Sequence, residues 1–175
     1  MDALTHAKAL VAFESPSYLS NREVTAYADD ALQGIGFATE RLDYEDEDGV
    51  PKACVVGRKG SGAGGVAYFG HTDVVPADDW MHAHGPFEST VRDGRLYGRG
   101  SCDMKGSIAC MLAAAERFDA SELQQPLYVA CTADEEIGYG GARKVAERSA
   151  YYREMVAADS YGIIGEPTVL EVVYA

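Results

Sequence analysis

The chain has 175 residues, a formal net charge of −13 at pH 7 and 47% apolar residues. This length suits one domain with a hydrophobic core, and the apolar fraction argues against a disordered chain. The strong negative charge disfavours nucleic acids and anionic membranes as partners, because both would be repelled.

The four cysteines are widely spaced and include no Cys-x-x-Cys pair, which favours a reducing, cytoplasmic location. Cys54, Cys110 and Cys131 lie in apolar runs, so we expect them to be small buried side chains. The opening residues contain neither a basic region nor a long apolar run, and we therefore expect no signal peptide.

Apolar periodicity predicts alternating helices and strands along the chain. In chain order, the expected elements are helices at 1–13 and 20–37, strands at 37–44, 53–59 and 65–70, a helix at 104–118, a strand at 126–133, a largely helical stretch at 138–157 and a strand at 161–165. Ser20 and Glu23 have the spacing of a capping box for the second helix. A long loop is expected from Val74 to about Ser101. This alternation predicts an α/β fold around a mostly parallel sheet.

The glycine-rich stretch at 60–65 matches the Gly-x-Gly-x-x-Gly pattern of dinucleotide-binding folds. In those folds the pattern follows a strand and opens a helix. Here it leads directly into the strand at 65–70, so we interpret it as a flexible connection between two strands.

One imidazole and several carboxylates follow predicted strands or open the helix at 104–118. In open α/β sheets, ligands bind beyond the carboxyl ends of the strands, so these side chains are expected on one rim. They are His71, Asp73, Asp103, Asp134, Glu135, Glu136 and Glu166. Closely spaced carboxylates repel one another, and a divalent cation removes that conflict. One histidine with several carboxylates favours zinc, cobalt or manganese over calcium.

Two spacings suggest roles within this rim. In extended chain, residues two apart point the same way, so His71 would bind the metal while Asp73 accepts a hydrogen bond from the other ring nitrogen. Glu135 and Glu136 are adjacent and point in different directions. One of them can therefore bind metal while the other exchanges a proton with the activated water.

Each feature also has a plainer interpretation. A His-x-Asp after a strand is commonly a turn, and adjacent glutamates commonly begin a solvated helix; their joint occurrence at three strand ends is what favours a site. His82 and His84 imitate a metal-binding pair, but they lie in a polar loop. Cys102 has no evident base beside it, and His6 is expected to be exposed on the first helix.

Four stretches together resemble the co-catalytic zinc aminoacylase and carboxypeptidase family, and are most similar to acetylornithine deacetylase and succinyl-diaminopimelate desuccinylase. They are GHTDVVP at 70–76, GPFESTVRDGRLYGRGSCDMKG at 85–106, TADEEIG at 132–138 and GEPT at 165–168. The resemblance implies a three-layer α/β/α fold of the zinc-exopeptidase type. It also implies a metal-dependent hydrolase of linear amide bonds that removes an acyl group from an N-acyl amino acid.

The resemblance further implies a pair of metal ions, zinc in the first place, with cobalt or manganese as alternatives. His71 and Glu166 would bind the first ion, Glu136 the second, and Asp103 would bridge the two. The peptide bond after Asp103 is expected to be cis. These roles follow from matching the motifs position by position.

In the same comparison, Glu135 would be the general acid and base, and Asp73 would support catalysis through His71. Members of the family continue well beyond this point, with a lid domain used for dimerisation and a final catalytic part that supplies a histidine to the second metal. We therefore expect residues 1–175 to be the N-terminal portion of a truncated catalytic domain, weak or inactive alone.

Two further interpretations stay open on sequence grounds. The same metal core serves zinc dipeptidases and carboxypeptidases, and a half-domain can also be a non-catalytic remnant that only binds metal. The expected partner is a small N-acyl amino acid or a short peptide. The family forms homodimers through the lid domain, so the oligomeric state of this chain is open.

Overall fold

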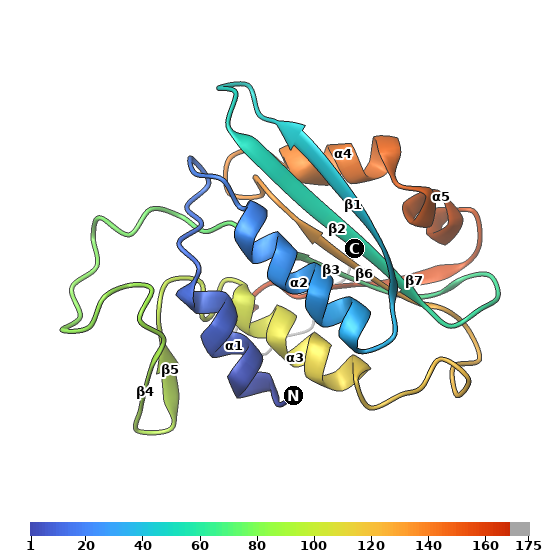
Figure 1. The fold of residues 1–175 in the computed structure, drawn as a ribbon, viewed down its shortest axis with the longest axis horizontal. Coiled ribbons are helices and arrows are strands. Elements are labelled where there is room, and N and C mark those ends of the chain that lie inside the picture. The colour runs from blue at the N-terminus through green and yellow to red at the C-terminus, as the bar shows by residue number, and fades with distance from the viewer. Residues whose placement is uncertain (169–175) are drawn as a thin grey trace.

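The computed structural model describes residues 1–168. Its helices are α1 (Ala3–Ala12), α2 (Arg22–Gly34), α3 (Lys105–Ala115), α4 (Gly140–Arg148) and α5 (Ala150–Val156). Its strands are β1 (Ala38–Glu45), β2 (Pro51–Lys59), β3 (Gly65–His71), β4 (Thr90–Arg92), β5 (Arg95–Tyr97), β6 (Leu127–Thr132) and β7 (Ser160–Ile164). A five-stranded sheet forms the middle layer, with α1, α2 and α3 on one face and α4 and α5 on the other (Figure 1). The expected three-layer α/β/α class is confirmed.

The sheet has the strand order β1-β2-β6-β3-β7 and is more mixed than expected. β3 pairs in parallel with β6 and with β7, whereas β2 pairs antiparallel with both β1 and β6. The short connection between β1 and β2 makes that pair a hairpin, which forces the antiparallel direction. The three parallel strands end at one edge of the sheet, and this edge is where the predicted site residues follow.

The alternation of side chains along β2 explains why helices cover both faces. Val55 packs with the helices α1–α3, while Cys54 and Val56 pack with α4. All three side chains are fully buried. A strand that is covered on both faces has a continuous run of apolar residues, and residues 53–56 form such a run. Tyr128 on β6 contributes to the smaller cluster beneath α5.

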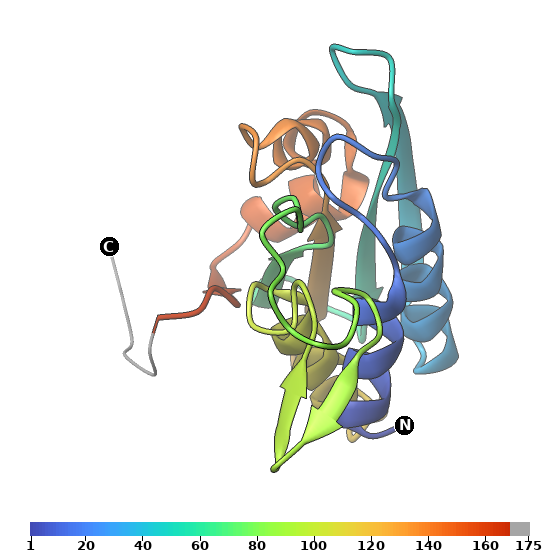
Figure 2. The ribbon, with the colours of Figure 1, turned by 90° about the vertical axis from the view of Figure 1, so that its left-hand side faces the viewer.

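The predicted long loop contains a hairpin that sequence analysis missed. β4 and β5 form a separate two-stranded sheet that extends away from the main body (Figure 2). Asp93 and Gly94 connect them with φ angles of 52° and 72°. Two successive residues with positive φ suit a tight turn that matches the twist of the strands, and Asp-Gly is a preferred sequence for it.

Several local expectations are corrected. The Ser20 side chain donates to the carbonyl of Pro51, and α2 begins at Arg22 without a side-chain cap, so the capping box does not form. His6 is buried, with its Nδ1 2.9 Å from the Tyr27 hydroxyl. Cys110 is exposed.

The stretch at 138–157 is two helices, because Ser149 has extended backbone and caps α5. Its hydroxyl accepts a hydrogen bond from the N–H of Tyr152. Within residues 1–168, every helix is too short or too polar to cross a bilayer.

Candidate metal centre

His71 stands at the end of β3 and is 1% exposed. Its Nδ1 lies 2.9 Å from the backbone carbonyl oxygen of Asp73. Because a carbonyl can only accept, this contact assigns the ring hydrogen to Nδ1 in the neutral imidazole. The lone pair of Nε2 is then available on the side that faces the carboxylates.

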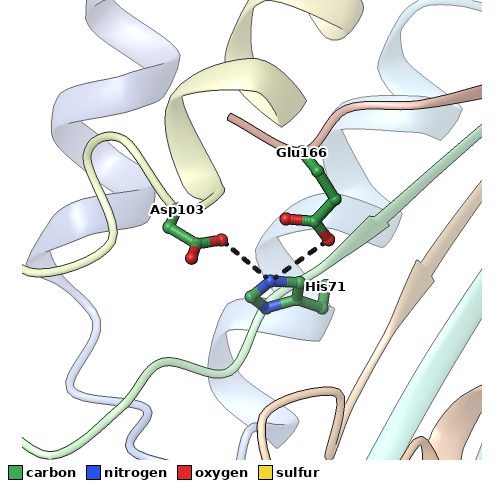
Figure 3. Close-up of side chains that lie close together, drawn as sticks. All are labelled: His71, Asp103 and Glu166. Atoms are coloured by element: carbon green, nitrogen blue, oxygen red, sulfur yellow. Dashed lines mark hydrogen bonds and ion pairs between the residues drawn. The ribbon is translucent and has the colours of Figure 1, made fainter. Parts of the chain in front are cut away.

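The Nε2 atom of His71 faces carboxylates from three other segments. It lies 3.2 Å from Asp103 Oδ1 and 3.7 Å from Glu166 Oε1. Figure 3 shows how both carboxylates point toward the imidazole ring. Glu135 Oε2 is 3.8 Å away. Asp103 comes from the turn before α3, Glu166 follows β7 and Glu135 follows β6. The side chains are 48%, 36% and 29% exposed, respectively, so a solute can reach the carboxylates from one side while the imidazole stays buried.

Two groups of donor atoms, each within 4.8 Å of one another, share this histidine. One group is His71, Asp103 and Glu166, and the other is His71, Glu135 and Glu136. The structure thus brings together all four residues that the sequence proposed as metal ligands, along with Glu135. The Asp103–Met104 peptide bond is cis, as expected.

Asp73 has a different role from the one expected of it. Its carboxylate Oδ1 is 3.6 Å from His71 Nδ1, so the ring is oriented by the backbone carbonyl of Asp73 instead. The carboxylate, which is 1% exposed, accepts a hydrogen bond from Ser17 Oγ at 2.7 Å. It also accepts from the backbone N–H groups of Glu135 and Glu136 at 3.3 and 3.4 Å. Asp73 therefore fixes the turn that carries both glutamates.

The electrostatics of this rim favour a cation. Burial raises the pKa of the Glu166 and Glu136 carboxyl groups, and the nearby charge of Asp103 raises the pKa of both further. Burial lowers the pKa of His71, but the charges of Asp73, Glu166 and Glu135 outweigh it and raise the pKa overall. The pKa values of all three groups are raised because the carboxylates crowd together without enough positive charge between them.

The residues fit a divalent metal ion. One imidazole nitrogen and carboxylate oxygens form a mixed nitrogen and oxygen donor set, which suits zinc and its neighbours in the transition series. The hydrogen bond that His71 Nδ1 donates to the Asp73 carbonyl is the supporting contact that metal-binding histidines usually have. The other two candidate histidines stay apart from this set: His82 and His84 stack on each other with ring centroids 5.4 Å apart, against Trp80 and Tyr97.

Sequence reasoning missed three supporting residues. Ser17 holds the Asp73 carboxylate, while Lys52 and Tyr44 contact Asp134, the residue before the two glutamates. Ser17 lies between α1 and α2, and the other two lie on the hairpin of β1 and β2. These residues are far along the chain from the motifs, so no local sequence pattern indicates their roles.

The chain is similar to known proteins in sequence and in fold. Residues 67–174 match the model for peptidase family M20/M25/M40. The chain is 42% identical over 165 residues to acetylornithine deacetylase from Myxococcus xanthus, covering 92% of this chain and 40% of that protein. The chain therefore spans well under half of that relative's length.

Solved structures show the same fold. Human carnosine dipeptidase 1 superposes with a TM-score of 0.77 at 26% identity, over 93% of this chain and 37% of that one. A metallo-carboxypeptidase of the M20 family, Sso-CP2 from Sulfolobus solfataricus, gives a TM-score of 0.73 at 24% identity, over 94% and 37%. With the family model matching more than half of its residues, the chain belongs to peptidase family M20/M25/M40.

Proposed function

We propose that this chain is the N-terminal portion of the catalytic domain of a metal-dependent amidohydrolase that removes the acyl group from an N-acyl amino acid. The observation that carries the proposal is the convergence of Asp103, Glu135 and Glu166 on Nε2 of the buried His71. The similarity to acetylornithine deacetylase supports this substrate class. The protein is proposed to act in the cytoplasm, where its four free cysteines remain reduced.

We assign His71, Asp103 and Glu166 to one ion, and Glu136 with a shared Asp103 to a second. The ions are proposed to be zinc, with cobalt or manganese as substitutes. A divalent metal supplies Lewis acidity there and lowers the pKa of water. The carboxylate of Glu135 takes a proton from the attacking water and returns it to the nitrogen of the leaving amine.

Asp73 holds the proposed ligands and the proposed base in fixed positions. The carbonyl of Asp73 holds His71 in one tautomer, and the carboxylate of Asp73 holds the turn of Glu135 and Glu136. Proton transfer requires the base to lie within hydrogen-bond distance of the attacking water. The backbone support that fixes the position of Glu135 therefore contributes to the rate. The 29% exposure of the Glu135 side chain leaves it accessible to a substrate.

The second candidate is a dipeptidase or carboxypeptidase with the same rim, favoured by the likeness to carnosine dipeptidase 1 and Sso-CP2. A third is a remnant that binds metal without turnover. Because the chain covers 40% of its curated relative, we expect little hydrolysis by this chain alone. In a longer protein that contains this portion together with the rest of the catalytic domain, acetate released from N-acetylornithine, compared with amino acid released from a dipeptide, distinguishes the three.

The first test is a zinc titration of the metal-free chain by calorimetry, with stoichiometry from elemental analysis. We expect about one tightly held zinc per chain, lost in His71→Ala. The matched control is His84→Ala, which removes a histidine outside both donor groups and should leave the stoichiometry unchanged. Zinc binding that is absent, or that survives His71→Ala, would overturn the proposal.

A further inference from the structure

Asp134 immediately precedes the two glutamates of the rim and is held in an unusual way. Its φ of 59° lies in the left-handed region, and its side chain is buried. One carboxylate oxygen, Oδ2, accepts a hydrogen bond of 2.6 Å from the Tyr44 hydroxyl. The other, Oδ1, lies 3.0 Å from Lys52 Nζ. Burial and the contact with Asp134 raise the pKa of Tyr44, so the hydroxyl stays protonated and donates.

Tyr44 and Lys52 are direct partners in the register of β1 and β2. Side chains of opposed residues in an antiparallel pair lie side by side on one face of the sheet. The two groups therefore reach Asp134 together from a single rigid hairpin. We call Tyr44, Lys52 and Asp134 the Asp134 clamp.

Lys52 is 1% exposed, which is rare for a lysine and requires partners. Its Nζ donates to the carbonyls of Ser17 and Leu19, and it also lies 3.5 Å from Asp46 Oδ2. The same ammonium group thus ties the segment between α1 and α2 to the loop after β6. Ser17 in turn donates to Asp73, so the clamp and the rim share a support.

The turn of Glu135 and Glu136 is consequently held from two directions. Asp73 accepts the N–H groups of both glutamates, and the clamp holds the side chain of the residue before them. A left-handed non-glycine residue costs energy and persists only where its surroundings enforce it. The side-chain contacts of Asp134 come from β1 and β2, at the far side of β6 from His71, and its carbonyl also accepts a hydrogen bond of 2.7 Å from the N–H of Tyr139.

We propose that Tyr44 and Lys52 are positioning residues that act through Asp134 to hold Glu135 and Glu136 at the rim. The consequence for metal binding rests on the proposed function. The effect on the turn itself does not, because it concerns the metal-free protein. The clamp is therefore testable even if the chain binds no zinc.

The test is hydrogen exchange of the Glu135 and Glu136 amides in metal-free Tyr44→Phe, followed by NMR. We expect exchange at these two amides to accelerate about tenfold, because one hydrogen bond to Asp134 is lost. The matched control is Tyr128→Phe, which also removes a hydroxyl donor to a carboxylate, Glu154, at 3.0 Å. It should leave both amides unchanged.

Zinc affinity gives the second readout. Tyr44→Phe should weaken several-fold the loosely held second zinc, to which Glu136 is assigned, and leave the affinity for the zinc of His71, Asp103 and Glu166 unchanged. It should have no effect on zinc affinity in Glu135→Gln/Glu136→Gln. If Tyr44 serves only the stability of the sheet, Tyr44→Phe should change neither zinc affinity in either background. If Lys52→Met alone fails to fold, Lys52→Met/Asp134→Asn removes both buried charges together and should still accelerate exchange of the two amides.

Unchanged exchange in Tyr44→Phe, or equal acceleration at amides throughout the sheet, would overturn the clamp. If the wild type binds zinc but exchange is unchanged in Tyr44→Phe, the clamp is wrong and the proposed function is retained. If exchange is faster in Tyr44→Phe but the wild type binds no zinc, the clamp is supported and the proposed function is wrong.

Discussion

The buried carboxylate of Asp73 accepts a hydrogen bond of 3.3 Å from the backbone N–H of Glu135, 62 residues further along the chain. This contact joins the end of β3 to the end of β6 at the point where both strands deliver their polar residues. A carboxylate that accepts hydrogen bonds from backbone N–H groups fixes the position of the backbone segment that carries them. The rim is thus built as much by backbone groups as by its candidate ligands.

Ser17→Ala should weaken zinc binding by about three- to tenfold, because Asp73 loses its 2.7 Å hydrogen bond and becomes less firmly oriented. The cost in unfolding free energy should be about 1 kcal/mol. Competition with a chromogenic chelator measures the affinity, and urea unfolding measures the stability. Ser160→Ala is the matched control, since its hydroxyl donates to the Met155 carbonyl away from the rim. Equal zinc affinity in the two variants would contradict this prediction.

In the metal-free protein, Glu136, Glu166 and His71 should contribute less to stability as pH rises. The folded-state pKa values of Glu136 and Glu166 lie above the usual 4.5, and that of His71 lies above 6.5. At these three groups, the folded state therefore holds protons more tightly than the unfolded state, and this stabilisation is lost as pH rises through the raised values. The loss begins above about pH 4.5 for the glutamates and above about pH 6.5 for the imidazole.

Zinc should show the opposite trend, because it replaces the protons on the ligands. Burial lowers the pKa of His6 and Lys105, which acts in the opposite direction on the stability of the whole protein. The contribution of the rim is therefore measured as the difference in melting temperature between metal-free wild type and metal-free Glu166→Gln from pH 5 to 8. This difference should move against the wild type as pH rises, and the increment produced by zinc in the wild type should grow. A difference that moves in favour of the wild type as pH rises would count against the assignment.

Gly141→Ala should destabilise the fold by about 3 kcal/mol, since added atoms are poorly tolerated in a packed interior. A Cβ at this position would lie 2.4 Å from the carbonyl oxygen of Ala133 and 2.8 Å from Cys54 Sγ. The start of α4 would be pushed away from the end of β6. Gly34→Ala is the control, because nothing lies within 4 Å of its Cβ. Urea unfolding should leave that variant neutral or slightly more stable.

Two of the four thiols should react quickly with an aromatic disulfide reagent in the native state. Cys102 and Cys110 are exposed, whereas Cys54 and Cys131 are buried. Burial raises the pKa of Cys54 and Cys131 to about 12, so few thiolates form there at pH 8. Spectrophotometric counting should give two fast thiols, with four after denaturation. Cys110→Ser should leave one fast thiol.

The rim was predictable because its residues follow strands, and the carboxyl ends of parallel strands share an edge. That rule placed His71, Glu135 and Glu166 together without knowledge of the strand order. It failed for the other half of the sheet, since an antiparallel β2 lies between β1 and β6. The strand pattern alone carries no information on direction for a run that is buried on both faces.

Other misses have local causes. The Asp93-Gly94 pair between Val91 and Leu96 indicates a hairpin, but it lies in the segment that was predicted to be a loop. Ser20 has a capping spacing, yet its hydroxyl bonds the Pro51 carbonyl, so a tertiary partner displaced the local one. The roles of Ser17 and of the Asp134 clamp depend on contacts between segments that are distant in the chain. Such contacts leave no periodic pattern in a single sequence.

The strand order also has a consequence for the way the chain is made. β2 and β3 are consecutive in sequence, but the strand between them, β6, is synthesised later. Until residues 127–132 leave the ribosome, the facing edges of β2 and β3 have no pairing partner within the sheet. Contacts of long sequence separation form slowly, and unpaired edges invite association with other chains. The rim therefore closes late, and a nascent chain that pauses before β6 exposes two apolar strands at once.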